Sequence, residues 1–376
     1  MASILFAGDF CPNGRVPKMI DKEEYGFLFD DIKGLVSEAD YSIVNFESTI
    51  ADSKLDKAII KSGPALCTTE KAIDAIKYAG FKCCSLANNH FNDYGRKGID
   101  NTIRVLHQKG LDKVGAGDNL KEAGEVLYKE VDGKSIAIIS CCEHEFSIAT
   151  SDMAGCNPLD PVALFYSISE AKRKAEYVFL IVHGGLEHIQ VPQPRMKELY
   201  RYFIDLGVDA VINHHQHCYN GMEVYNGKPI FYGLGNFCFD WEGKRNCIWN
   251  YGYMAKINLS EKLSYEVIPY KQCNIEPTVS LLDDIELGKF NEEFQSLSDI
   301  IQDDNLLQKA NEDFYRSKLT QYRWIFEPYS GRILTGLYFR KLLPSFAKNN
   351  LSEKQNFIEC ESHREALLKC IKNKWL

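Results

Sequence analysis

The segment Gly207-Val-Asp-Ala-Val-Ile-Asn-His-His-Gln-His-Cys218 decides the fold that we expect. Its apolar run, Val208 to Ile212, is typical of a buried strand, and three of the chain's nine histidines follow within four residues. His215 and His217 are two residues apart, so a short turn can direct both rings to one point. Imidazole is a common ligand of transition metals at neutral pH. The segment therefore predicts either a metal site at a strand end or a polar, histidine-rich loop.

Four other predicted strands also end in side chains that can bind metals. The strands are 4–7, 41–45, 82–86 and 177–182, and they lead to Asp9, Glu47, Asn89-His90 and His183. Predicted helices at 22–38, 69–78, 97–109, 161–174 and 194–206 alternate with the strands, as is typical of a parallel α/β sheet. Ligands of such sheets collect outside the carboxyl ends of the strands. We therefore expect these side chains to meet at one edge.

Two hairpin signals predict that antiparallel strands are added to the parallel ones. Asp132-Gly133 joins the apolar segments 126–131 and 135–142, and Asn226-Gly227 joins 221–225 and 229–232. Both dipeptides favour two-residue turns. Segments 251–259 and 263–270 alternate like further antiparallel strands. The chain therefore predicts two packed mixed sheets with helices outside, a four-layer α/β/β/α sandwich over residues 1–275, and a helical extension over residues 276–376.

Composition narrows the class of protein. A net charge of −8 argues against a nucleic-acid-binding protein, which usually has a basic face. Thirteen cysteines, with Cys83-Cys84 and Cys141-Cys142 inside apolar runs, indicate small buried residues in a reducing compartment. We read neither a signal peptide nor an apolar run of the ~18–20 residues that a membrane span needs. These features predict a cytoplasmic protein.

The ligand types at the strand ends indicate which metal they suit. Carboxylates and an amide supply oxygen and histidines supply nitrogen, a mixed set that suits Mn²⁺, Fe or Zn²⁺ better than a cysteine-rich structural zinc. Each residue also has a structural alternative, because Asp9 or Asn89 can cap a helix and His183 can be a core imidazole. The coincidence of five such strand ends favours a site for one or two divalent ions.

The ordered motifs resemble a known family. They are Gly8-Asp9, Asn45-Phe46-Glu47, Ala87-Asn-Asn-His90 with Asp93-Tyr94-Gly95, Val182-His183-Gly184 with Glu187, His215-Gln216-His217 and Gly235-Asn236-Phe237. Over residues 1–240 the chain resembles the bacterial capsule synthesis proteins named for CapA (the PGA_cap domain), a branch similar to the calcineurin-like metallophosphoesterases. The resemblance implies a metal-dependent phosphoesterase-like hydrolase in the biosynthesis of capsule, surface polysaccharide or poly-γ-glutamate. The alternative is a non-catalytic accessory subunit of a polymer-synthesis complex, and hydrolysis of a γ-linked amide is a further option.

The same resemblance implies a role for each residue. Asp9 and His217 would hold a first metal, Asn89, His183 and His215 would hold a second, and Glu47 would bridge both. His90 would donate a proton to the leaving group or stabilise charge, and Asp93 would orient His90.

One motif departs from the metallophosphoesterase pattern. Those enzymes carry Asp-x-His at the first strand end, whereas this chain has Asp9-Phe10-Cys11. The first site is therefore expected to be weak, or Cys11 replaces the imidazole as a thiolate, or Cys11 is only a small loop residue.

Charged residues near the loops are candidates for binding a small anionic or phosphorylated substrate. Arg15 and Lys61 would pair with phosphate or carboxylate oxygens, and Glu187 would support the site from the His183 loop. The alternative for Arg15 and Lys61 is an ordinary solvated charge. His214 is expected to point away from its histidine neighbour.

The last part of the chain has a different composition. Residues 331–376 contain nine Lys and Arg against four Glu, and 331–346 carries enough apolar residues for a helix face. The functional interpretation is a lid, or a peripheral platform for a partner or for anionic lipids of the inner membrane. The structural interpretation is a helical cap packed on the sandwich.

Overall fold

The computed structural model describes the whole chain except residues 1, 261, 360–362, 365–367, 369–370 and 372–376. Two compact units are present, Met1–Gln308 and Lys309–Leu376. The composition changes near residue 275, but α8 (Asp284–Gln302) still packs against β11 (Met222–Tyr225). Met222 N donates to Ser298 Oγ at 3.1 Å in this contact. The first compact unit therefore extends beyond the change in composition.

The first sheet has the strand order β16-β15-β14-β1-β2-β3-β4, with β13 paired to the end of β1. Its strands are β1 (Ser3–Phe10), β2 (Tyr41–Phe46), β3 (Cys83–Ser85), β4 (Asp112–Val114), β13 (Asn236–Cys238), β14 (Tyr251–Asn258), β15 (Ser264–Gln272) and β16 (Val279–Leu281). β1 to β4 are parallel, and β14 to β16 add antiparallel pairs.

The second sheet has the order β11-β12-β10-β9-β7-β6. Its remaining strands are β6 (Leu127–Val131), β7 (Lys134–Cys142), β9 (Tyr177–His183), β10 (Ala210–His214) and β12 (Lys228–Phe231). A separate small sheet pairs β5 (Ala116–Gly117) with β8 (Gly155–Cys156). β6–β7 and β11–β12 are the two predicted hairpins. Both central residues of each turn have positive φ, as Asp-Gly and Asn-Gly permit.

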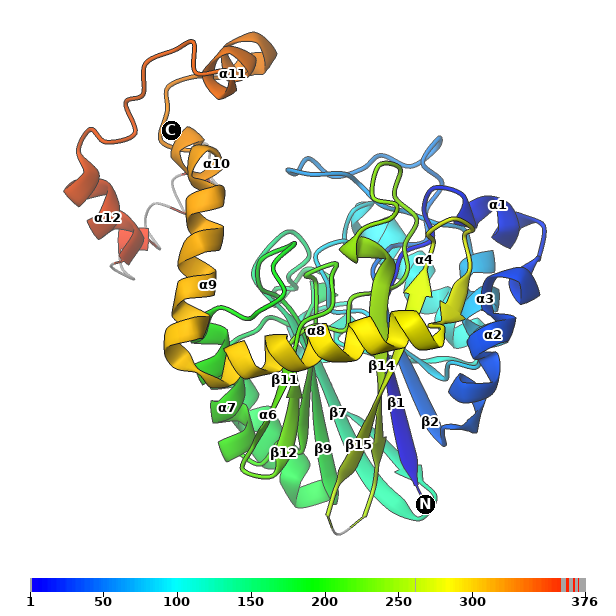
Figure 1. The fold of residues 1–376 in the computed structure, drawn as a ribbon. Coiled ribbons are helices and arrows are strands. Elements are labelled where there is room, and N and C mark those ends of the chain that lie inside the picture. Colours follow the sequence, from blue (N-terminus) through cyan, green and yellow to red (C-terminus); the bar gives the residue numbers. More distant parts are fainter. Residues whose placement is uncertain (1, 261, 360–362, 365–367, 369–370, 372–376) are drawn as a thin grey trace. The chain divides into compact units, whose positions relative to one another are not determined.

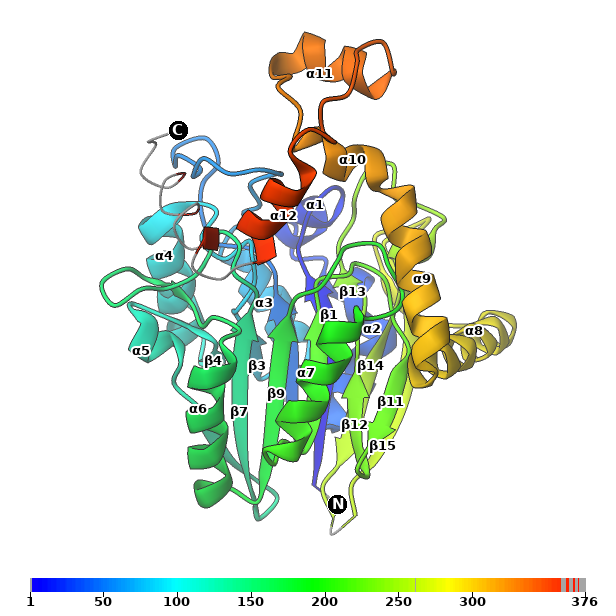
Figure 2. The ribbon, with the colours of Figure 1, turned by 90° about the vertical axis from the view of Figure 1, so that its left-hand side faces the viewer.

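Helices cover the outer face of each sheet (Figures 1 and 2). The first sheet carries α1 (Val16–Asp21), α2 (Tyr25–Glu38), α3 (Lys71–Ala79) and α4 (Gly95–Gln108), and the second carries α6 (Pro161–Lys174) and α7 (Pro194–Asp205). Two short elements, α5 (Leu120–Ala123) and η1 (Ile248–Asn250), lie in connections. The predicted four-layer α/β/β/α sandwich is confirmed.

β1 shows how the sequence specifies these layers. All eight of its residues are buried, as expected for a strand covered on both faces. Ile4 and Phe6 pack between the sheets, where the ring of Phe6 lies 5.7 Å from that of Phe179. Leu5 and Ala7 belong to the cluster that includes α2, α3 and α4. Alternate side chains therefore hold different layers together.

The second unit is helical. It begins within α9 (Asp304–Ser317) and contains α10 (Leu319–Trp324), α11 (Gly331–Phe339) and α12 (Leu351–Glu359). Its loops are tied internally, since Glu327 accepts from Phe346 N at 2.7 Å and Tyr329 OH donates to Pro344 O at 2.6 Å. No helix in the described part of the chain is both long and apolar enough to cross a bilayer.

Candidate metal centre

The predicted strand ends do meet. Six of the predicted side chains gather where parallel strands of the two sheets end: Asp9 in β1, Glu47 after β2, Asn89 after β3, His183 in β9, and His215 and His217 after β10. Strand register aligns them, because Asp9 pairs with Asn45 and His214 with His183. All six side chains are buried.

Gly8 sets the position of Asp9. A side-chain carbon on Gly8 would lie 1.9 Å from the carbonyl oxygen of Gly235, which is far inside contact distance. Asp9 N donates to the same oxygen at 3.0 Å. Glycine therefore permits β1 to approach the segment before β13, and Asp9 projects from this fixed point.

The histidine turn has an unusual backbone. His215 has φ of 101° and His217 has φ of 55°, a region that residues with side chains rarely adopt. Their ring centroids lie 6.2 Å apart. Strained backbone of this kind is found where the surrounding structure holds a functional side chain in place.

One ligand group contains Glu47, His183 and His215, whose candidate ligand atoms lie within 4.8 Å of one another. His183 Nε2 lies 3.1 Å from both His215 Nδ1 and Asn89 Oδ1, and 3.8 Å from Glu47 Oε1. Burial lowers the pKa of His183 well below its usual range, so this imidazole is neutral at physiological pH.

A second group contains Asp9, Glu47 and His217. His217 Nε2 lies 3.7 Å from Glu47 Oε1, and Nδ1 lies 3.8 Å from Asp9 Oδ2. Burial lowers the pKa of His217 to about 4. Burial favours the neutral acid at Asp9, but the hydrogen bond and charge of His214, with the other nearby histidines, hold its pKa below the usual range.

Glu47 belongs to both groups and shows that the site fits a cation. Its side chain is fully buried, and neither carboxylate oxygen has a hydrogen-bond partner among the described residues. Burial, together with the charges of Asp9 and Glu187, raises its pKa well above the usual range. An unpaired buried carboxylate is costly, and a divalent ion offsets that cost.

His90 lies beside these groups and contacts the Asp93 carboxylate. His90 Nδ1 is 2.7 Å from Asp93 Oδ2, and His90 Nε2 is 4.0 Å from Glu47 Oε1. Asp93 also forms an ion pair with Lys61. The Lys61 side chain is buried, so its interpretation as a solvated charge is wrong.

The Arg15 guanidinium is engaged by protein groups, and its predicted role in substrate binding stays a prediction. Arg15 Nε donates to Asp240 Oδ2 at 2.8 Å, and its other guanidinium nitrogens donate to Asp240 Oδ1 and to the carbonyls of Cys273, Asn274 and Ile275. Both terminal nitrogens and Nε are thus engaged by the protein. Arg15 ties the loop after β1 to the ends of β13 and β15.

Cys11 is a packing residue here. It lies in a small apolar cluster with Leu66, Phe239 and Trp249. Burial, with the negative charges of Glu47 and other carboxylates, raises the pKa of its thiol well above the usual range. Among the described residues, the groups suited to a metal do not include Cys11.

Glu187 lies at the edge of the centre and is about half exposed. Partial burial raises its pKa, but the charges of His217, His215 and His188 outweigh this effect and lower it. Its position is compatible with the predicted supporting role.

Sequence reasoning missed the residues that support the ligands. The His214 side chain is buried, and its Nδ1 lies 3.3 Å from Asp9 Oδ1. Asn45 Nδ2 donates to Asp9 Oδ1 at 2.7 Å and lies 3.2 Å from His183 Nδ1. Asn45 stood in a quoted motif, but its partners come from distant strands, so the sequence did not reveal its contacts.

A known protein family matches the part of the chain that carries this site. The family described as "Bacterial capsule synthesis protein PGA_cap" matches residues 3–241, which include all six candidate ligands. The chain belongs to this family. The resemblance stated from the motifs is confirmed.

Two curated relatives of the chain are named CapA. The chain is 31% identical over 245 residues to the capsule biosynthesis protein CapA of Bacillus anthracis, covering 63% of this chain and 60% of that protein. It is 33% identical over 241 residues to the PGA biosynthesis protein CapA of Bacillus subtilis (strain 168), covering 63% of each. The chain thus spans less than two thirds of the length of these relatives.

A more distant relative is a probable polyglutamine synthesis accessory protein of Mycobacterium tuberculosis (strain H37Rv), with 27% identity over 255 residues, covering 61% of this chain and 63% of that protein. Among solved structures, a putative 5′-nucleotidase from Staphylococcus aureus matches with 15% identity and a TM-score of 0.44, covering 78% of this chain and 58% of that chain.

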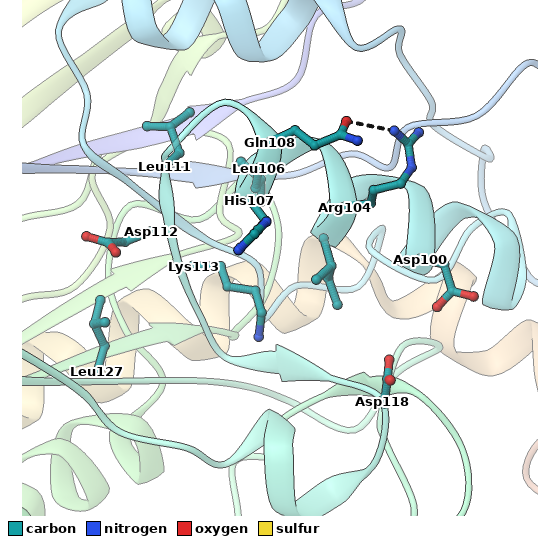
Figure 3. Close-up of a pocket in the computed structure, with 11 residues that line it drawn as sticks. Asp100, Arg104, Leu106, His107, Gln108, Leu111, Asp112, Lys113, Asp118 and Leu127 are labelled. Atoms are coloured by element: carbon teal, nitrogen blue, oxygen red, sulfur yellow. Dashed lines mark hydrogen bonds between the residues drawn. The ribbon is translucent and has the colours of Figure 1, made fainter.

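A separate pocket lies beside α4, β4 and β6 and shares none of the candidate ligands (Figure 3). Figure 3 shows Arg104 and Gln108 joined by a hydrogen bond. Arg104 Nη1 donates to Gln108 Oε1 at 2.8 Å. Lys113 Nζ donates to the carbonyl of Ala116 at 2.8 Å. Neither of the groups suited to a metal that occur among the described residues lies in this pocket.

Proposed function

We propose that this chain is a metal-dependent hydrolase of the phosphoesterase type that acts in capsule or poly-γ-glutamate biosynthesis. The observation that carries the proposal is the buried Glu47 carboxylate, which belongs to two ligand groups and has no hydrogen-bond partner in the part of the chain that the structure describes. A purely structural core has no use for such a group, because unpaired buried charge destabilises a fold.

The residues present define two overlapping ligand sets. Asp9, Glu47 and His217 would hold one divalent ion, and Glu47, Asn89, His183 and His215 would hold another. Bound Mn²⁺, Fe or Zn²⁺ would supply Lewis acidity and lower the pKa of water. The neutral imidazoles that burial produces are the form in which histidine binds a metal.

His90 is the proposed catalytic residue of the protein itself. Asp93 accepts from His90 Nδ1, which leaves Nε2 directed to the side on which Glu47 lies. From this position His90 would stabilise charge or, as the doubly protonated imidazolium, pass its Nε2 proton to the leaving oxygen of a small phosphorylated substrate and become neutral, with its remaining proton on Nδ1.

Turnover of an aryl phosphate tests the proposal. Chelator-treated protein should be inactive, gain activity with Mn²⁺, and lose most of that activity in His90→Asn. His107→Asn, in α4, is the matched control and should leave turnover unchanged. Absence of metal-dependent turnover on all phosphoesters tried would contradict the proposal.

A non-catalytic accessory role is the second candidate. It is favoured by the Mycobacterium tuberculosis relative, which is named as an accessory protein. In that case the protein would bind metal without hydrolysing phosphoesters, and His90→Asn would leave its role in polymer synthesis intact.

A further inference from the structure

The irregular segment 51–66, between β2 and α3, is fastened to one residue of the candidate site. Ile59 N donates to the Asp93 carbonyl at 2.9 Å, and Leu66 N donates to Asp93 Oδ2 at 2.7 Å. Two backbone groups, near the middle and the end of the segment, therefore bind the residue that orients His90.

Lys61 lies between these two anchors and points inward. Its side chain is 2% exposed, whereas its neighbour Ile60 is 98% exposed. Lys61 Nζ forms an ion pair with Asp93 Oδ1, lies 3.1 Å from His90 Nδ1, and is 5.1 Å from the ring of Phe146. The chain thus buries a cation and exposes an apolar side chain, the reverse of the usual preference.

The two oxygens of Asp93 have different partners. Oδ2 accepts hydrogen bonds from His90 Nδ1 and Leu66 N, and Oδ1 forms the ion pair with Lys61 Nζ. Both Asp93 oxygens are fully buried, so their orientation depends on these protein groups. Without the ammonium group, Oδ1 would lose its ionic partner and the carboxylate could rotate away from the imidazole.

We propose that Lys61 is a positioning residue, which holds the Asp93 carboxylate and through it the His90 ring by fastening segment 51–66 to the His90 turn. The sequence suggested Lys61 as a direct substrate ligand. The two roles differ in their consequences, because a substrate ligand acts mainly on KM, whereas a group that orients His90 acts on kcat. The kinetic consequence rests on the proposed hydrolase function.

Lys61→Met tests the proposal, because methionine keeps much of the length and removes the charge. The matched control is Lys57→Met, the same change at an exposed lysine of the same segment. With Mn²⁺ and an aryl phosphate, Lys61→Met should lower kcat about 10- to 100-fold with KM changed less than about twofold. Lys61→Arg should recover part of the loss, and Mn²⁺ affinity should stay unchanged in all variants.

Unchanged kcat in Lys61→Met, or a raised KM at unchanged kcat, would overturn the proposal.

Two measurements test the positioning role of Lys61 without enzyme turnover. In the metal-free protein, the proton signal of His90 Nδ1, assigned by its loss in His90→Gln, should persist in Lys57→Met and vanish or shift in Lys61→Met. Trypsin should cut after Lys54 faster in Lys61→Met than in the wild type. Unaltered proton signal and cleavage would refute the positioning role, whereas missing wild-type turnover would refute only the hydrolase.

Discussion

Asn236 Oδ1 lies 3.0 Å from Nδ1 of His217. The Asn236 side-chain nitrogen Nδ2 donates its two hydrogens to the backbone carbonyls of His217 and Trp249, at 3.2 Å each. Oδ1 must therefore accept, and His217 carries its proton on Nδ1. This leaves Nε2 with a free lone pair on the side where Glu47 lies, 3.7 Å away.

Asn236→Ala should therefore weaken metal binding without removing a ligand. Loss of the partner that fixes the His217 tautomer is expected to lower Mn²⁺ affinity about 10- to 100-fold. Titration calorimetry checks this, with Asn305→Ala, an exposed position at the start of α9, as the control. Equal affinity in both variants would show that the tautomer of His217 does not matter.

Glu47→Gln should change stability in opposite directions with and without metal. In chelator-treated protein the variant should match or exceed the wild type in its free energy of unfolding, because the unpaired carboxylate is gone. With Mn²⁺ at about 100 times its Kd, the wild type should gain about 2.7 kcal/mol and the variant much less. Urea unfolding measures both values. Glu38→Gln, an exposed helix position, should behave as wild type.

Metal affinity should rise with pH. The pKa of Glu47 is raised by burial, so a proton competes with the cation there, whereas His217, with a pKa of about 4, is already neutral above pH 6. Release of one proton makes the affinity rise by up to about tenfold per pH unit until Glu47 is ionised.

The same shift affects the metal-free protein. A raised folded-state pKa of Glu47 stabilises the fold at low pH, and this contribution is lost as the pH rises through the folded-state value.

Calorimetry in buffers of different ionisation enthalpy counts the protons that are released when the metal binds. Affinity that stays constant from pH 6 to 8 would mean that Glu47 is already ionised.

Arg15→Met should reduce stability and leave substrate handling intact. The buried Asp240 carboxylate would lose its bidentate partner, at a cost of about 1–3 kcal/mol in the free energy of unfolding. Arg245→Met is the control, because Arg245 reaches the same carboxylate only at 3.4 and 3.5 Å. A KM that rises at least tenfold in Arg15→Met alone would restore the substrate-binding interpretation.

The sequence predicted the layers, and it predicted which candidate ligand residues would lie together, because both depend on local patterns. Buried strands end at chemically distinct residues, and parallel strands bring those ends to one edge, so Asp9, Glu47 and His183 were accessible to sequence reasoning. The contacts of Arg15 and Lys61 could not be predicted from the sequence. Asp240 is 225 positions away from Arg15, and Lys61 lies in an irregular segment whose path to Asp93 follows no repeating pattern. Very short strands such as β4 and β13 also carry too few residues to show a period.

Metal uptake tests the central claim most directly. Chelator-treated protein is loaded with Mn²⁺, freed of excess ion, and its metal content is measured beside that of Glu47→Gln and the double variant His183→Ala/His217→Ala. We predict one to two ions per wild-type chain, a large reduction in Glu47→Gln, and almost none in the double variant. Wild-type protein that retains neither Mn²⁺, Fe nor Zn²⁺, or a double variant that retains as much as wild type, would contradict the account.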